Sequence, residues 1–111
     1  MRDYPEYRSE LNKQVLKLRK EIPGTMQGFA DLRSKTMVDG ALDVKTKELM
    51  ALAISIAIRC QGCISYHVKG ALDHGANREE IAETIALSIY MGGGPSMVYG
   101  CEALAALDQF S

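Results

Sequence analysis

The sequence has little of several features that mark unusual proteins. It contains no tryptophan and only three prolines in 111 residues, while 47% of the residues are apolar and 24% are charged. This composition excludes a collagen-like, low-complexity or disordered chain. Domains usually hold ~100–200 residues. We therefore expect a single domain over residues 1–111, with N-terminal helices in residues 1–40 and a core in residues 41–111.

An excess of one charge, a long apolar run and an export signal are also missing. Thirteen basic residues against fourteen acidic ones give a net charge of -1, which argues against nucleic acid or an anionic membrane surface as a partner. The longest apolar stretch runs only from Leu49 to Ile58 and is interrupted by Ser55, whereas a membrane span needs ~20 residues. The segment Met1 to Glu6 lacks the apolar region and cleavage site of a secretory signal. We therefore expect a cytoplasmic protein.

Cysteine is scarce, with three residues in the whole chain. Cytosolic reductants keep ordinary thiols reduced, so three cysteines favour reactive or buried thiols over a disulfide framework. Cys101 lies on the apolar face of the last predicted helix, and we interpret it as a small buried hydrophobic residue.

Strict apolar–polar alternation, the pattern of half-buried strands, is hard to find, whereas helical spacing recurs along the chain. We predict an all-α fold, a compact bundle of about six helices. The expected helices cover residues 6–21, residues 25–38, a segment that follows the N-cap Asp43 and includes residues 49–58, residues 60 or 63 to 73, a segment that starts at the capping box of Asn77 and Glu80, and a segment that starts at Pro95.

The third of these helices has apolar residues in nearly every direction around its axis between Leu49 and Ile58. Such a helix has to be buried on all sides. A chain of this length covers one helix completely more easily when identical chains pack against it. We therefore expect a homo-oligomer.

The residues with the clearest chemistry are Cys60, Cys63 and His67. In a helix, residues spaced by three and seven positions lie within an arc of about 60° and share one face. Cα atoms three residues apart are about 5 Å from each other, which suits a reversible disulfide. A helix N-terminus favours the thiolate, and His67 is placed to take the thiol proton. The pattern indicates a redox pair.

Two other interpretations of the cysteines remain. A zinc site needs four ligands, and the further candidates His74, Cys101 and the carboxylates form no second ligand pair. The cysteines could also be buried and inert. The histidine on the same face favours redox chemistry.

Five segments together resemble the carboxymuconolactone decarboxylase superfamily, and within it the alkylhydroperoxidase D-like branch more closely. The resemblance covers roughly residues 40–107, and the family spacing of a glutamate, a Cys-x-x-Cys motif and a histidine is met by Glu48, Cys60, Cys63 and His67. The five segments are Lys47–Ser55, Cys60–Cys63, Tyr66–His67, Gly75–Ile81 and Met91–Pro95.

The resemblance implies a thiol-dependent peroxidase that needs no organic cofactor and no metal. By resemblance, Cys63 attacks the hydroperoxide, Cys60 resolves the sulfenic acid to a disulfide, and His67 and Glu48 relay protons. An external dithiol or thioredoxin-like reductant would restore the thiols, and by the same resemblance we expect the homo-oligomer to be a trimer or a hexamer. One departure is Gly62, because alkylhydroperoxidase D proteins carry a further histidine between the cysteines. That difference bears on the rate, not on the redox couple.

Glu48 poses a geometric problem. Continuous helix would separate it from Cys60 by about 18 Å, so its carboxylate joins the site only if the next helix folds back or another subunit intervenes. Otherwise Glu48 is a first-turn residue favoured by the helix dipole. Two alternative functions remain, a lactone decarboxylase of the kind that named the superfamily and a non-enzymatic redox-sensing oligomer.

Overall fold

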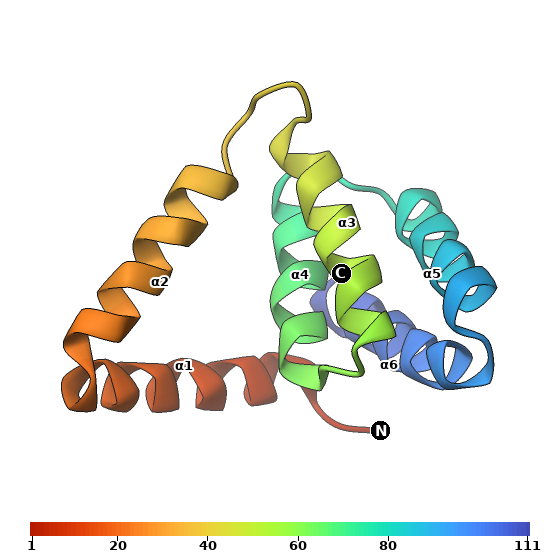
Figure 1. Cartoon of the computed structure of the whole chain (residues 1–111). Helices are drawn as coiled ribbons and strands as arrows, with labels where there is room; N and C mark the ends of the chain where they lie inside the picture. The colour runs from red at the N-terminus through yellow and green to blue at the C-terminus, as the bar shows by residue number, and fades with distance from the viewer.

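The computed structural model describes all 111 residues and consists of six α-helices without a β-strand, which confirms the predicted all-α fold (Figure 1). The helices lie close to their expected places, and the first two begin two residues earlier than predicted. Their bounds are α1 Tyr4–Glu21, α2 Pro23–Thr36, α3 Val44–Ala57, α4 Gln61–Asp73, α5 Arg78–Gly92 and α6 Gly94–Phe110.

Short polar side chains set several helix starts. Asp3 caps α1 by accepting the Glu6 N–H at 3.0 Å, and Asp43 caps α3 by accepting the Thr46 N–H at 2.8 Å. Asn77 and Glu80 form the expected capping box of α5. These bonds satisfy backbone donors that lack partners inside the helix.

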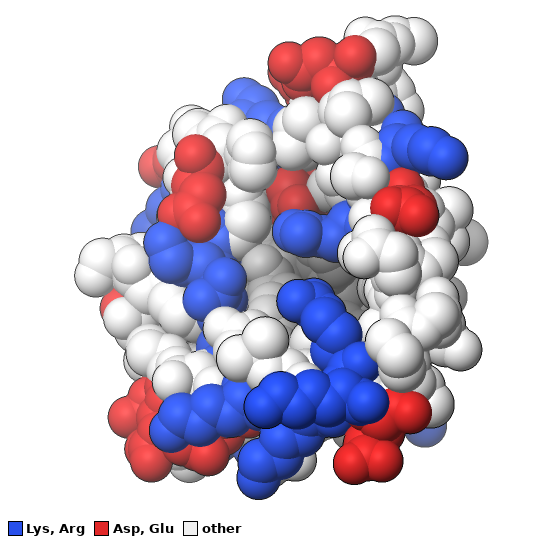
Figure 2. Space-filling view, turned by 90° about the vertical axis from the view of Figure 1, so that its left-hand side faces the viewer, with Lys and Arg blue, Asp and Glu red and all other residues white.

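Helices α3, α4, α5 and α6 pack around one core, and α1 lies across the end of α4 and α6 (Figure 1). In contrast, α2 makes its only substantial contact with α1 and contains no buried residue. Figure 2 shows the molecule from the side on which α2 lies in Figure 1. On this face, Lys and Arg side chains surround a hollow, and acidic side chains lie among them. The core consists of Tyr4, Leu52, Ile56, Ile64, Val68, Ala71, Ala76, Ile81, Ala103, Ala106 and Leu107.

The prediction that Cys101 is buried is wrong, whereas the burial of α3 on all sides, which was expected to involve identical chains, stays a prediction. In the single chain, Met50 and Ile54 of α3 are 49% and 59% exposed and the C-cap Ile58 is 64% exposed, because only one side of this helix faces the core. Cys101 is also exposed, since the core side of α6 carries Ala103 and Ala106. Its thiol instead lines a shallow apolar groove between α5 and α6. None of the six helices has the length and apolar character to span a bilayer.

A tight reversal joins α3 to α4. Arg59 adopts a φ of 61°, its N–H bonds to the Ile56 carbonyl at 3.1 Å, and the Cys60 N–H bonds to the Ser55 carbonyl at 3.0 Å. This pair of bonds around a left-handed residue is the Schellman arrangement that ends a helix. It sends α4 back alongside α3.

Candidate functional site

The cysteine motif forms the N-terminus of α4. Cys60 and Cys63 are joined by a disulfide, with their Cα atoms 5.2 Å apart. Cys60 was expected to lie within the helix and to share a face with Cys63 and His67, but it is the N-cap of α4. Its Sγ accepts the Cys63 N–H at 3.1 Å. The cap position puts the Cys60 sulfur at the positive end of the helix dipole, which favours a thiolate there once the disulfide is reduced.

One turn beyond Cys63, His67 meets Glu48. The His67 Nδ1 and the Glu48 Oε2 are 2.9 Å apart, with the glutamate side chain 4% exposed and the histidine side chain 28% exposed. Because a carboxylate only accepts hydrogen bonds, Nδ1 donates, which leaves Nε2 of the neutral ring as a proton acceptor. Glu48 reaches the site because α4 runs back along α3, so the separation expected for continuous helix does not apply.

Gly70 makes room for the Glu48 carboxylate. A Cβ at residue 70 would lie 2.7 Å from the Glu48 Cδ and 3.0 Å from its Oε1, closer than real side chains approach. A glycine inside a helix costs about 1 kcal/mol relative to alanine, so close packing accounts for its use here. Gly70 was not among the residues expected at the site, although an isolated glycine in a helical pattern is a signal for such packing.

Helix α1 covers the middle of the cysteine motif. A Cβ at Gly62 would lie 3.0 Å from the Leu11 Cδ1 and 3.7 Å from the Tyr7 hydroxyl. A larger side chain at residue 62 therefore requires the Leu11 side chain of α1 to shift. The close approach of α1 gives a physical reason for glycine at the position where alkylhydroperoxidase D proteins have a histidine.

The other candidate residues lie apart from this site. His74 ends α4, where its Nδ1 lies 2.8 Å from the Gly70 carbonyl oxygen. Cys101 faces its own groove on α6. No group of three or more His, Cys, Asp or Glu side chains is arranged to hold a metal ion.

Comparison with known proteins identifies the family. The sequence model of the carboxymuconolactone decarboxylase family matches residues 23–106. The crystal structure of a protein of that family from Legionella pneumophila has a TM-score of 0.94 and 44% identity, over 97% of this chain and 96% of that one.

Two further relatives cover most of the chain. The crystal structure of a family protein from Thermotoga maritima, for which involvement in an antioxidative response has been suggested, has a TM-score of 0.76 and 34% identity over 97% of this chain and 89% of that one. An uncharacterised protein of Cupriavidus necator is 38% identical over 90% of this chain and 88% of its own length. The chain therefore belongs to the carboxymuconolactone decarboxylase family, as its sequence motifs predicted.

Proposed function

We propose that this protein is a thiol-dependent peroxidase of the alkylhydroperoxidase D-like kind. The observation that carries the proposal is the Cys60–Cys63 disulfide at the start of α4, one turn before a histidine held by a buried glutamate. A disulfide between residues three apart closes too small a loop to stabilise the fold much. The arrangement thus supports a redox function over a structural one.

In the proposed reaction, the Cys63 thiolate attacks one oxygen of the hydroperoxide. The O–O bond breaks, Cys63 becomes a sulfenic acid, and the other oxygen leaves as an alcohol after taking a proton. His67 holds that proton on Nε2, having received it from the Cys63 thiol, while Glu48 stabilises the charged ring through Nδ1. His67 lies one helical turn from Cys63, where side chains four residues apart are neighbours.

In the second step, the Cys60 thiolate attacks the Cys63 sulfenic acid and forms the disulfide, and the hydroxide that leaves Cys63 takes the proton that the Cys60 thiol gave up and departs as water. The hydrogen bond that the Cys63 N–H donates to the Cys60 Sγ stabilises the Cys60 thiolate as the nucleophile. An external dithiol then returns two electrons by thiol–disulfide exchange and closes the cycle. The T. maritima relative with a suggested antioxidative involvement agrees with this proposal.

The test is hydroperoxide turnover with a dithiol donor in three matched variants. Cys63→Ser should abolish turnover, and Cys60→Ser should stop after one event with a trapped sulfenic acid or mixed disulfide. Cys101→Ser, which changes an exposed thiol outside the site, should retain activity. Sustained turnover in either the Cys60→Ser or the Cys63→Ser variant would contradict the proposal, and lactone turnover that survives thiol alkylation would favour a decarboxylase.

We further propose that the protein assembles with copies of itself. The exposed apolar side of α3 includes Met50 and Ile54, and the helix α2, which has no buried residue, exposes Phe29 and Leu32 by 65% and 60%. Identical chains would supply both faces at once, and apolar surfaces of this kind mark protein contacts. The test is the mass in solution by light scattering, which should exceed one chain and fall in a Phe29→Ser variant.

A further inference from the structure

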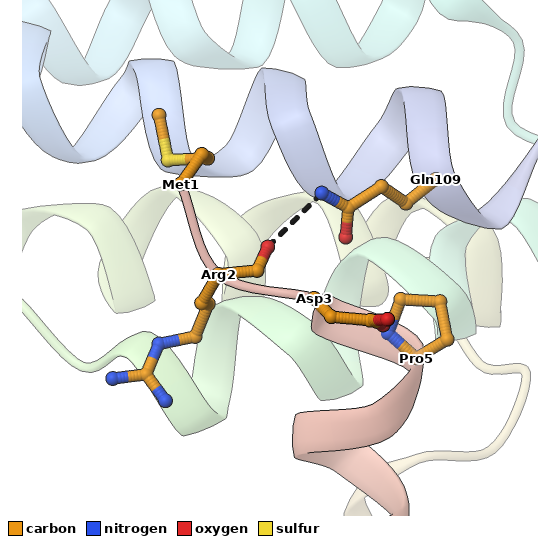
Figure 3. A pocket seen from close by; sticks show the side chains of 5 residues that line it. All are labelled: Met1, Arg2, Asp3, Pro5 and Gln109. Atoms are coloured by element: carbon orange, nitrogen blue, oxygen red, sulfur yellow. Dashed lines mark hydrogen bonds between the residues drawn. The ribbon is translucent and has the colours of Figure 1, made fainter.

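The first turn of α1 is held against the last turn of α6 by one side chain. The Gln109 Oε1 accepts the Tyr4 N–H at 2.6 Å. The Gln109 Nε2 donates to the Arg2 carbonyl at 3.0 Å, and Figure 3 shows this second bond. Helix α1 lies outside residues 23–106, the part of the chain that the family match covers. This clamp therefore fixes a helix that the family match does not include.

The clamp buries Tyr4 near a carboxylate. The Tyr4 side chain is 0% exposed, and its hydroxyl has no hydrogen-bond partner, as is also the case for the buried Oε2 of Glu102 on α6. Burial, and next the negative charge of Glu102, raise the pKa of Tyr4 well above its usual value. Native proteins leave few such groups without partners, and those few call for an explanation.

The other oxygen of Glu102 contacts the cysteine motif. The Gln61 Nε2 donates to the Glu102 Oε1 at 3.1 Å, and Gln61 stands next to Cys60 at the first helical position of α4. A second carboxylate is therefore tied to the motif from α6, in addition to Glu48 from α3. Nothing in the proposed proton relay uses it.

We propose that Glu102 is a positioning residue whose negative charge, held by Gln61, limits the thiolate content of the reduced Cys60–Cys63 pair. This inference rests on the redox function proposed above. A nearby negative charge disfavours a thiolate and so opposes the helix N-terminus, which favours it. The Glu102 Oε2 is buried, and the field of a buried charge is screened less than that of an exposed one.

The size of the effect follows from the length of the Gln61 side chain. That length places the carboxylate on the order of 10 Å from the sulfur atoms. At an effective dielectric constant of ~20, a unit charge at that distance shifts a thiol titration by about one pH unit. Other charged or titratable groups of this region are Arg2, Tyr4, Tyr7 and Arg8 on the α1 side, Glu48 on α3, Arg59 directly before Cys60, and Tyr66 and His67 on α4.

The test is the pH dependence of alkylation of the reduced pair in a Cys101→Ser background, followed by mass spectrometry of the peptide that contains residues 60 and 63. Glu102→Gln keeps an oxygen for Gln61 and removes the charge. Its alkylation midpoint should fall by about one pH unit, with severalfold faster alkylation at neutral pH. Glu83→Gln, the same change at an exposed position of α5, should leave the midpoint unchanged.

An unchanged midpoint in folded Glu102→Gln, or an equal shift in Glu83→Gln, would overturn the proposal. If Glu102→Gln does not fold, Gln61→Leu releases the carboxylate instead and should shift the midpoint in the same direction by less. No shift in that variant would overturn the proposal as well. The experiment uses no hydroperoxide, so a protein without peroxidase activity could still pass it, and the two proposals fail separately.

Discussion

Replacing Gly70 by alanine tests the packing that brings Glu48 to His67. The added Cβ would lie 2.7 Å from the Glu48 Cδ, and the glutamate is only 3% exposed, so the carboxylate has little room to move. Overpacking costs about 1–3 kcal/mol, and the better helix propensity of alanine offsets about 1 kcal/mol of this. We therefore expect the free energy of unfolding to fall by up to about 2 kcal/mol. Hydroperoxide turnover should fall by at least about tenfold, because the relay loses its geometry.

Gly28→Ala is the matched control. Gly28 lies in α2 with no atom within 4 Å of an added Cβ, so this variant should gain about 0.5–1 kcal/mol in urea unfolding. In a Glu48→Ala background the clash is gone, and Gly70→Ala should then also be stabilising. If Gly70→Ala stabilises the unmodified protein as much as Gly28→Ala does, the reasoning about the carboxylate is wrong.

Three further predictions concern other parts of the chain. Arg59→Gly should raise the free energy of unfolding by about 0.5–1 kcal/mol, because residue 59 has a left-handed φ of 61°; no gain in urea unfolding would contradict this. The hydrogen bond to Lys45 holds the pKa of Glu80 below its usual value of 4.5. The ionised Glu80 therefore stabilises the folded chain above about pH 4.5, and this stabilisation is lost as the pH falls through the lowered pKa. The free energy of unfolding should therefore fall less in Glu80→Gln than in the unmodified protein between about pH 5 and about pH 3. An equal fall in both proteins would refute the stabilising role of the Glu80 carboxylate. Phe29→Ser should lower the mass measured in solution without unfolding the chain, and an unchanged mass would argue against α2 as a contact.

Local chemistry made much of the fold predictable from the sequence. Asp43 and Asn77 cap their helices as expected because capping depends on side chains a few residues apart. The reversal at Arg59 was harder to predict, because glycine is the usual residue with a left-handed φ. Without that reversal, the distance from Glu48 to the cysteines looked too long.

Burial and contacts between helices were less predictable. The apolar residues around α3 indicated burial, but a periodic pattern does not say which neighbour covers each face, and the single chain leaves Ile54 and Ile58 exposed. For the same reason Cys101 was wrongly expected in the core. Glu102 gave no sequence signal, since its link to Gln61 joins residues 41 positions apart.

The most direct test of the central claim, that Cys60 and Cys63 form the working redox couple, is a thiol count on the reduced protein before and after one equivalent of a hydroperoxide. Mass spectrometry of the peptide containing both residues would accompany it. The account predicts a rapid loss of two thiols, a new disulfide within that peptide and an unmodified Cys101. Three unreacted thiols would contradict it and return the cysteine pair to a structural role.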